Sequence, residues 1–433
     1  MTLDLAELAT RFAGAETVQA IGRLRSVVGL AIEADVPGIR LGELCEIERR
    51  GGPPLLAEVV GFRDQAATLL PLGNPVGLGP DDVVRRADQR LQVVVGPALL
   101  GRVLDGLGRP IDDGPLLSGE PGEVMASAPA PLSRPRIGSR LTTGIRVLDG
   151  LLTLAEGQRI GLFAGSGVGK SSLLGQIARQ AQADVFVVCL VGERGRELGD
   201  FLHDALGEAG RQRGVVVCAT SDAPPLVRMK CPYVATAIAE GFRERGARVL
   251  LLMDSVTRFA RAARDVGLTV GEAPARRGYP PSVFAALPAL IERAGPSARG
   301  SITGIYTVLV EGDDLDEPIA DELRGLLDGH IVLSRALASR SHYPAIDVPA
   351  SLSRLMPRVA EREHVQAAAK VREHIAVHEQ KRDLVALGAY VPGSDRRLDA
   401  ALARADSIET FLRQDSGTAC AFDETLTALQ ALV

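Results

Sequence analysis

The sequence of 433 residues contains no tryptophan, and aromatic residues make up only 3% of it. Proteins that bind single-stranded nucleic acid stack its bases on aromatic side chains, so this scarcity argues against such a function. The formal net charge of −5 gives no support to an extended nucleic-acid surface either. We therefore expect no nucleic-acid partner.

Long apolar runs and paired cysteines are also missing. No apolar run approaches the roughly 20 residues that cross a bilayer as a helix. Asp4 and Glu7 interrupt the segment in which a signal peptide would place its apolar residues. The five cysteines form no C-x-x-C pair and are odd in number, which favours reduced structural thiols. We expect a cytosolic globular protein, and its length predicts two or three domains.

The pattern of apolar and turn residues changes along the chain. Short β-type runs separated by glycine and proline predict a small barrel over residues 17–88. Continuous apolar strands alternating with helices predict an α/β core with a parallel sheet over residues 89–350, which includes a Gly- and Pro-rich connector at 106–135. Helical periodicity predicts an α-helical domain over residues 351–433 and a short amphipathic helix within residues 1–16.

A glycine-rich segment follows residues 158–163, which are expected to form a strand. It matches the phosphate-loop pattern G-x-x-x-x-G-K-[ST], except that Ala164 stands where the pattern begins with glycine. We expect Ala164 to end the preceding strand, where its methyl group costs little. Backbone N–H groups of such a loop cradle phosphates at a helix N-terminus, while the lysine reaches the β- and γ-phosphates and a hydroxyl binds Mg²⁺. The segment therefore predicts an ATP and Mg²⁺ site. Its expected binding residues are Gly165, Ser166, Gly167, Val168, Gly169, Lys170, Ser171 and Ser172.

Two acidic residues end later apolar strands. Asp254 closes the run 248–254, so its carboxylate is expected at the carboxyl edge of the sheet, where Mg²⁺ sits in phosphate-loop enzymes. Glu193 follows the run 185–191 and could polarise the attacking water while Arg194 holds the γ-phosphate. On composition alone, a solvated charged turn is an equal alternative for this second segment.

Several segments together closely resemble the ATPases of type III protein export, namely the flagellar export ATPase and its virulence-injectisome counterpart. These enzymes are relatives of the rotary ATP synthase catalytic subunit. The resemblance runs from about Gly22 to Leu429 and implies a RecA-like phosphate-loop core between an N-terminal β-barrel and a C-terminal helical domain. The segments that carry it, besides the phosphate loop, are GERGRE at 192–197, LMDSVTRFA at 252–260, RGYPPS at 277–282 and HYPAID at 342–347.

The resemblance implies a role for each residue of the site. Glu193 would be the catalytic glutamate that activates water, with Arg194 near the γ-phosphate. Glu197 and Asp254 would help Ser171 to order magnesium and its waters. Arg258 would belong to the same site.

Two further residues have roles by resemblance. Tyr343 resembles the tyrosine that stacks against adenine, and an ordinary half-buried loop aromatic is its alternative reading. Arg354 matches the arginine that this family inserts into the neighbouring subunit's site. A homohexamer is therefore implied, in which Arg354 and Lys170 of one chain serve adjacent sites.

The resemblance also implies partners and a location. A central stalk protein or an unfolding substrate would pass the turns at 278–279 and 313–314, and a stator protein would dock on the helix within residues 1–16. Chaperone–cargo complexes would be released at the ring, which would lie peripherally on the cytoplasmic face of the inner membrane beside the export gate. The segments 42–46 and 311–314 look more like the injectisome branch than the flagellar one.

Three alternatives stay open. A rotary ATP synthase or proton-pump catalytic subunit shares the core, although the segment 271–294 favours export. A non-hydrolysing regulatory ring subunit would lack the acid at Glu193. A ring helicase or transcription terminator is disfavoured by the acidic pI and the few aromatics.

Overall fold

The computed structural model describes residues 21–87, 89–310, 312 and 314–433. The helix expected within residues 1–16 lies outside the described residues. The described chain divides into two compact units: one contains the described residues from Ile21 to Leu91 together with Val266–Glu272, and the other contains those of Gln92–Asp265 and Ala273–Val433. Within the described residues, no helix combines the length and the apolar character that a membrane span requires.

The first unit is built around a closed antiparallel barrel, as the short β-type runs predicted. The strands follow one another around the barrel in the order β1-β2-β5-β4-β3-β6. Alternate residues face inward, and Ile32, Ala34 and Leu69 are fully buried in the barrel core. Its strands are β1 (Ile21–Val28), β2 (Ala31–Asp35), β3 (Leu44–Ile47), β4 (Leu55–Arg63), β5 (Ala66–Pro71) and β6 (Val83–Arg86).

The second unit contains the predicted sheet, whose strands run in the order β19-β18-β12-β17-β15-β13-β14-β8. The pairs from β18 to β8 are parallel, whereas β19 is antiparallel to β18. All nine residues of β13 are buried, because helices cover both faces of the sheet. The sheet strands are β8 (Val103–Asp105), β12 (Arg159–Ala164), β13 (Val185–Glu193), β14 (Gly214–Thr220), β15 (Arg248–Asp254), β17 (Ser301–Leu309), β18 (Gly329–Leu333) and β19 (Ile346–Ser353).

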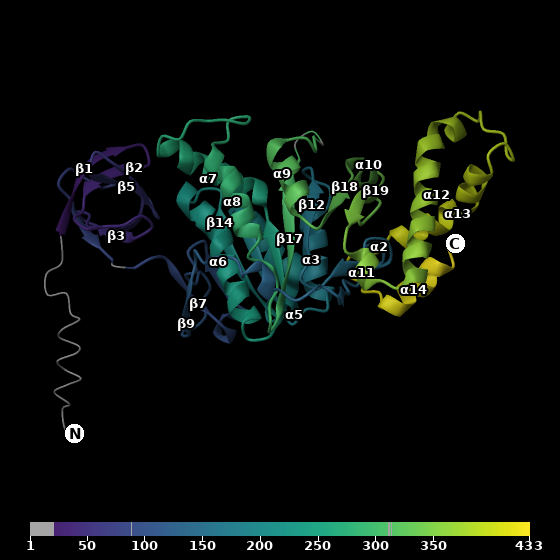
Figure 1. Ribbon diagram of the computed structural model, residues 1–433, viewed down its shortest axis with the longest axis horizontal. Helices are drawn as coiled ribbons and strands as arrows, with labels where there is room; N and C mark the ends of the chain where they lie inside the picture. The colour runs from purple at the N-terminus through teal and green to yellow at the C-terminus, as the bar shows by residue number, and fades with distance from the viewer. Residues whose placement is uncertain (1–20, 88, 311, 313) are drawn as a thin grey trace, which may run out of the picture. The chain divides into compact units, whose positions relative to one another are not determined.

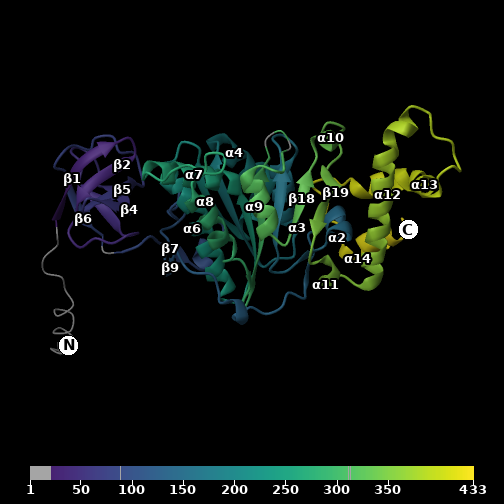
Figure 2. The same cartoon turned by 45° about the horizontal axis from the view of Figure 1, so that its top comes forward.

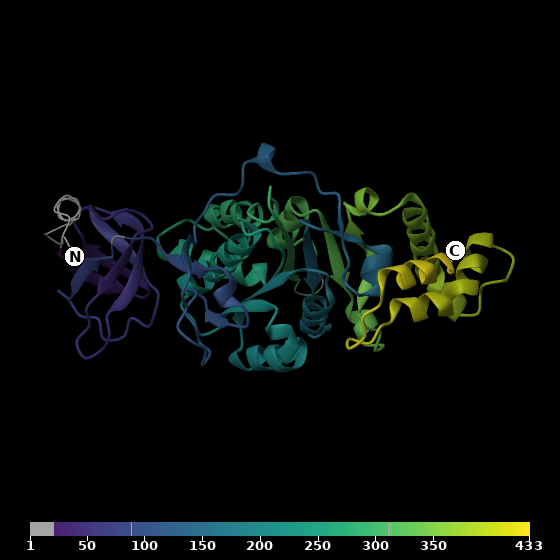
Figure 3. The ribbon, with the colours of Figure 1, turned by 90° about the horizontal axis from the view of Figure 1, so that it is seen from below.

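Helices lie on both sides of this sheet, as Figure 3 shows. Helix α6 packs against β13, β14 and β15, and α3 contacts β15 and the π-helical turn η3. The helices of the core are α2 (Arg146–Leu151), α3 (Lys170–Gln180), α4 (Gly195–Asp200), η3 (Phe201–Leu206), α5 (Gly207–Arg211), α6 (Pro225–Arg243), α7 (Val256–Thr269), α8 (Pro281–Ile291), α9 (Pro318–Leu326) and α10 (Arg335–Ala338).

Short elements accompany the sheet. The expected connector contains β9 and then runs over the outside of the core, interrupted only by the turn η2 (Figure 3). These elements are β7 (Gln92–Val95), η1 (Pro97–Leu99), β9 (Glu120–Glu123), η2 (Pro131–Ser133), β10 (Arg140–Leu141), β11 (Leu154–Ala155) and β16 (Gly295–Pro296).

The C-terminal region is helical, as predicted, although β19 continues the sheet to Ser353. Asp395 caps the N-terminus of α13, where its carboxylate accepts hydrogen bonds from the backbone N–H groups of Arg397 and Leu398. Phe411 and Leu429 are buried in the same core as α2, and Figure 2 shows α12, α13 and α14 gathered beside that helix. The helices are α11 (Met356–Val359), α12 (Arg362–Ala386), α13 (Arg396–Leu412) and α14 (Phe422–Gln430).

One buried ion pair joins three segments of the second unit. The guanidinium of Arg293 is fully buried, and it donates to both carboxylate oxygens of Glu240 on α6 and to the carbonyl oxygen of Val124, 2.6 Å away. Removing one partner of such a pair leaves an uncompensated charge in a medium that solvates it poorly.

We expect Glu240→Ala to lower the free energy of unfolding by about 3–5 kcal/mol, because it strands the Arg293 charge. Glu120→Ala is the matched control, since it removes from β9 an exposed partner of Arg245, which follows α6, and should cost less than about 1 kcal/mol. Urea unfolding followed by circular dichroism measures both. Equal losses in the free energy of unfolding for the two variants would contradict the larger cost of breaking the buried pair.

Candidate nucleotide-binding site

The phosphate loop lies at the carboxyl edge of the sheet, between β12 and α3. Ala164 is the last residue of β12 and is buried, with its carbonyl oxygen accepting from the N–H of Val310. The alanine therefore belongs to the strand, as expected, and the glycines of the turn begin after it. Gly167 (φ 77°) and Gly169 (φ 86°) adopt left-handed backbone, which glycine reaches at little cost.

The residues of the loop differ in exposure in a way that suits phosphate binding. Gly165 and Val168 are buried and anchor the turn, while Ser166, Gly167, Ser171 and Ser172 are exposed. Helix α3 begins at Lys170, so the N–H groups of its first turn face the same opening.

Lys170 is held by the acid that ends β15. Its Nζ lies 2.5 Å from Oδ1 of Asp254, and that oxygen also accepts a hydrogen bond of 2.7 Å from the hydroxyl of Thr307 on β17. Asp254 and Thr307 are both buried. Sequence reasoning missed Thr307, because β17 also carries hydroxyl groups at Ser301, Thr303 and Tyr306 and nothing in the sequence singles out Thr307.

Glu193 is also at this edge and is almost completely buried. Its Oε2 lies 3.2 Å from the guanidinium of Arg258, and its Oε1 lies 3.9 Å from Nζ of Lys170. Burial is the largest cause of a raised pKa of about 7 for Glu193, followed by a hydrogen bond to Glu197 and the nearby charge of Asp254. The same hydrogen bond is the largest cause of a lowered pKa of Glu197.

The oxygen Oε1 of Glu193 is buried and has no hydrogen-bond partner among the described residues. A buried carboxylate oxygen without a donor is costly. A water molecule held for attack on a phosphate, or one bound to Mg²⁺, would supply that donor. The exposed hydroxyl of Ser171 and the carboxylate of Asp254 lie at the same edge, so the residues fit a hydrated Mg²⁺.

Arg194 and Arg354 are not brought into this cluster. The side chain of Arg194 is 81% exposed, and its ion-pair partner is Glu197 at 3.9 Å. Arg354 follows β19, whose last residue, Ser353, pairs with Gly329 at the start of β18. The guanidinium of Arg354 donates to the carbonyl oxygen of Arg324. Arg354 therefore lies at the amino edge of the sheet, opposite the phosphate loop.

Tyr343 lies over the end of the phosphate loop. A Cβ atom built on Gly169 would come within 3.2 Å of its ring. The ring is 45% exposed and borders a cavity of about 370 Å³ that Gln414 also lines. The backbone N–H of Gln414 donates to the carbonyl oxygen of Tyr343, and its side-chain amide donates to the carbonyl oxygen of Gly144.

The segment 413–420, between α13 and α14, was not among the predicted site residues. It forms the other side of the cavity beside Tyr343. Its Asp-Ser-Gly turn at 415–417 marks a loop in the sequence. That signal says nothing about which distant residue the loop meets.

The comparisons with known proteins cover nearly the whole chain. Residues 144–353 match the nucleotide-binding domain of the ATP synthase alpha/beta family, residues 24–88 match the beta-barrel domain of that family, and residues 360–431 match the T3SS EscN ATPase C-terminal domain. The chain is 50% identical over 428 residues to the type 3 secretion system ATPase of Xanthomonas euvesicatoria, covering 98% of this chain and 96% of the relative. The chain belongs to the family of type III secretion and flagellar export ATPases.

Relatives of both branches of this export ATPase family match at similar identity. The flagellum-specific ATP synthase of Bacillus subtilis is 46% identical over 414 residues, covering 95% of this chain and 94% of the relative. The solved structure of the assembled ATPase EscN from enteropathogenic E. coli aligns with a TM-score of 0.90 at 44% identity, covering 95% of this chain and 99% of that one. These matches support ATP hydrolysis and the expected fold.

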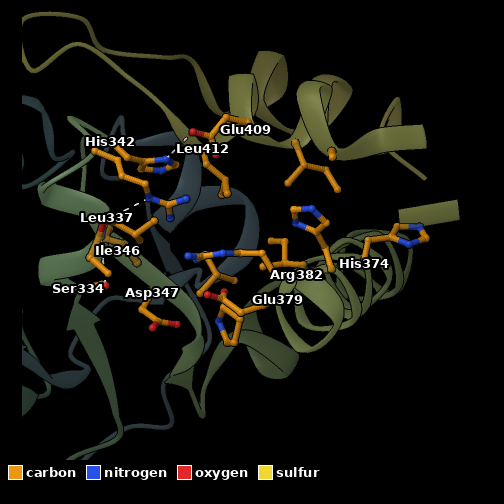
Figure 4. A pocket seen from close by; sticks show the side chains of 18 of the residues that line it. Ser334, Leu337, His342, Ile346, Asp347, His374, Glu379, Arg382, Glu409 and Leu412 are labelled. Carbon is orange, nitrogen blue, oxygen red and sulfur yellow. Dashed lines mark hydrogen bonds and ion pairs between the residues drawn. The ribbon is translucent and has the colours of Figure 1, made fainter. Parts of the chain in front are cut away.

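In this export ATPase, the C-terminal helices hold the residue next to Tyr343. His342 is buried, and its Nδ1 lies 3.0 Å from Oε1 of Glu409 on α13. Figure 4 shows the two side chains facing each other at the rim of a cavity between the core and these helices. Glu409 also accepts from Arg413, which precedes Gln414. The C-terminal helices are thus tied to both sides of the Tyr343 cavity.

We expect Glu409→Ala to raise the KM for ATP about threefold to tenfold while kcat changes little. The variant removes the hydrogen bond that holds His342, so the neighbouring Tyr343, whose expected role is in nucleotide binding, is held less firmly. Asp406→Asn is the matched control, since Asp406 lies one turn earlier on α13 and makes no hydrogen bond to His342. Steady-state ATPase kinetics measure both. A fall in kcat at unchanged KM would contradict this role.

Proposed function

We propose that this ATPase hydrolyses ATP to ADP and phosphate to energise protein export through an injectisome, releasing chaperones and unfolding cargo. The observation that carries the catalytic part is the convergence of Lys170, Glu193 and Asp254 at the phosphate loop. The injectisome assignment rests on the resemblance of residues 42–46 and 311–314. Loss of protein injection but not of swimming, on deletion of the gene, would support that branch; the reverse would refute it.

The residues of the site divide the chemistry among them. The loop amides and Lys170 hold the phosphates. When ATP binds, the ammonium group of Lys170 leaves Asp254 and contacts the β- and γ-phosphate oxygens instead. Glu193 orients the attacking water and accepts its proton, while Arg258 holds the carboxylate in place. Ser171, Asp254 and Glu197 would hold Mg²⁺ and its waters, and the bound ion would offset the charge of the phosphates. Tyr343 would stack against the adenine.

The active unit is a homohexamer in this proposal. Arg354 lies at the sheet edge opposite its own phosphate loop, so it serves a site on the neighbouring subunit together with that subunit's Arg194. The relative EscN has been solved in an assembled form and in complex with its central stalk EscO. By analogy, a central stalk protein occupies the middle of the ring, the N-terminal helix meets a stator protein, and chaperone–cargo complexes reach a cytoplasmic ring at the inner-membrane export gate.

A rotary ATP synthase subunit is the second candidate, since the core matches that family. The match of residues 360–431 to the T3SS EscN C-terminal domain favours export.

Assembly predicts that ATPase activity per subunit depends on protein concentration. We expect kcat per subunit to rise at least tenfold as the protein passes from monomer to ring, because each site gains an arginine from its neighbour. ATPase assays on a dilution series, run beside analytical ultracentrifugation, measure this. Equal activity per subunit of monomer and ring would refute the proposal that a neighbouring subunit completes each site.

A further inference from the structure

A second cavity, of about 500 Å³, adjoins the phosphate loop. It is lined by Gly165 and Ser166 of the loop, by the end of β17 and by side chains from α6, α7 and α10. Its side-chain chemistry is dominated by one residue type. The four arginines on its wall are Arg228, Arg258, Arg261 and Arg335.

The carboxylates that pair with these arginines lie outside the lining of the cavity, and one of the arginines has no such partner in the described part of the chain. No carboxylate is among the described residues that line the cavity. Arg258 pairs with Glu193, and Arg228 reaches Asp265 at 3.7 Å. The exposed side chain of Arg335 makes no hydrogen bond or ion pair within the described part of the chain. Clustered guanidinium groups in a wall without carboxylates create a positive potential that attracts anions.

Arg258 borders both the cavity and the proposed catalytic site. This residue contacts Glu193, and its guanidinium also donates to the carbonyl oxygen of Gly192, which lines the cavity. Gly165 and Ser166, which belong to the phosphate loop, line the cavity as well. An anion that leaves the γ-phosphate position past Arg258 would therefore enter a chamber of arginines.

We propose that this cavity is a second phosphate site, which receives the inorganic phosphate released by hydrolysis. The proposal rests on the proposed function and adds to it a route for the product. Phosphate is a small tetrahedral anion whose oxygens match the forked donors of arginine. Arg228, Arg261 and Arg335 hold it there, while Arg258 stands between the two positions.

In the experiment that tests this proposal, the γ-phosphate position is occupied first, and binding of inorganic phosphate is then measured. The full-length ring is saturated with a non-hydrolysable ATP analogue and Mg²⁺, and binding of radiolabelled inorganic phosphate is measured at equilibrium. We expect saturable binding of one phosphate per analogue-filled site. Arg335→Gln and Arg228→Gln should each weaken it about tenfold, as expected for losing a charged hydrogen-bond donor.

Arg340→Gln is the matched control, because Arg340 is exposed five residues after Arg335 and does not line the cavity. Circular dichroism and binding of the analogue verify that each variant folds and keeps the nucleotide site. No phosphate binding to the analogue-filled ring, or equal binding by wild type and both variants, would overturn the proposal. Tighter binding of glycerol 2-phosphate than of phosphate would assign the cavity to a phosphorylated regulator instead. A protein that does not bind the analogue at all would refute the proposed function rather than this route.

Discussion

Glu193→Gln is expected to leave ATP binding intact and to lower kcat by about 10²–10⁴-fold, the range typical of losing a general base. The amide keeps the size of the side chain but cannot accept the proton of the attacking water. Glu193 is nearly buried and within 3.9 Å of Lys170, so the change acts beside the phosphates. Single-turnover hydrolysis and titration with a fluorescent ATP analogue separate the two effects.

The pH dependence supplies a second readout for the same residue. The pKa of Glu193 is raised to about 7, first by burial, so the active carboxylate is present above that pH and is lost as pH falls through it. We expect kcat/KM to fall about tenfold per pH unit below 7, because this ratio reports the free enzyme. Glu208→Gln, at an exposed position on α5, should keep wild-type kinetics. Near-normal turnover of Glu193→Gln would show that Glu193 is not the general base.

Arg354→Ala is expected to lower kcat by about 10³–10⁵-fold, the range for an arginine supplied across an interface. Nucleotide binding to an isolated subunit should not change, because Arg354 lies at the opposite edge of the sheet from its own phosphate loop. Arg354→Lys should recover little, since lysine lacks the planar fork that binds phosphate oxygens.

The control for this second variant is Arg358→Ala, an exposed arginine one turn further along the chain. It should retain wild-type activity in the ring. A variant Arg354→Ala that forms rings and hydrolyses ATP normally would show that the site is complete within one subunit.

The sequence pattern predicted those parts of the site that short, contiguous segments of the chain form. The phosphate loop needs glycine at Gly167 and Gly169 for left-handed backbone, and a lysine at the start of α3, so its sequence alone was enough to recognise it. Asp254 was recognisable because a buried parallel strand delivers its last residue to the carboxyl edge. Pattern alone left Glu193 as either a site residue or part of a charged turn, and the family resemblance assigned its role. The barrel, the parallel sheet and the helical end followed from changes in apolar periodicity.

The parts that pattern did not reveal come from long-range packing. Thr307 and Asp254 are 53 residues apart, and Gln414 and Gly144 are 270 apart, so no window of sequence contains both partners. The arginines of the second cavity are spread between Arg228 and Arg335 on three helices. Sheet order brings them together, and this order cannot be read from the spacing of the strands. Arg194 points to solvent here, and its role stays a prediction.

Mixing two inactive variants tests the central claim, that each active site is completed by its neighbour. Rings assembled from equal amounts of Glu193→Gln and Arg354→Ala subunits contain, at about a quarter of their interfaces, an intact Glu193 facing an intact Arg354. We predict that the mixture regains ATPase activity well above the sum of the two separate variants. A mixture that forms rings yet hydrolyses no more ATP than that sum would contradict the account.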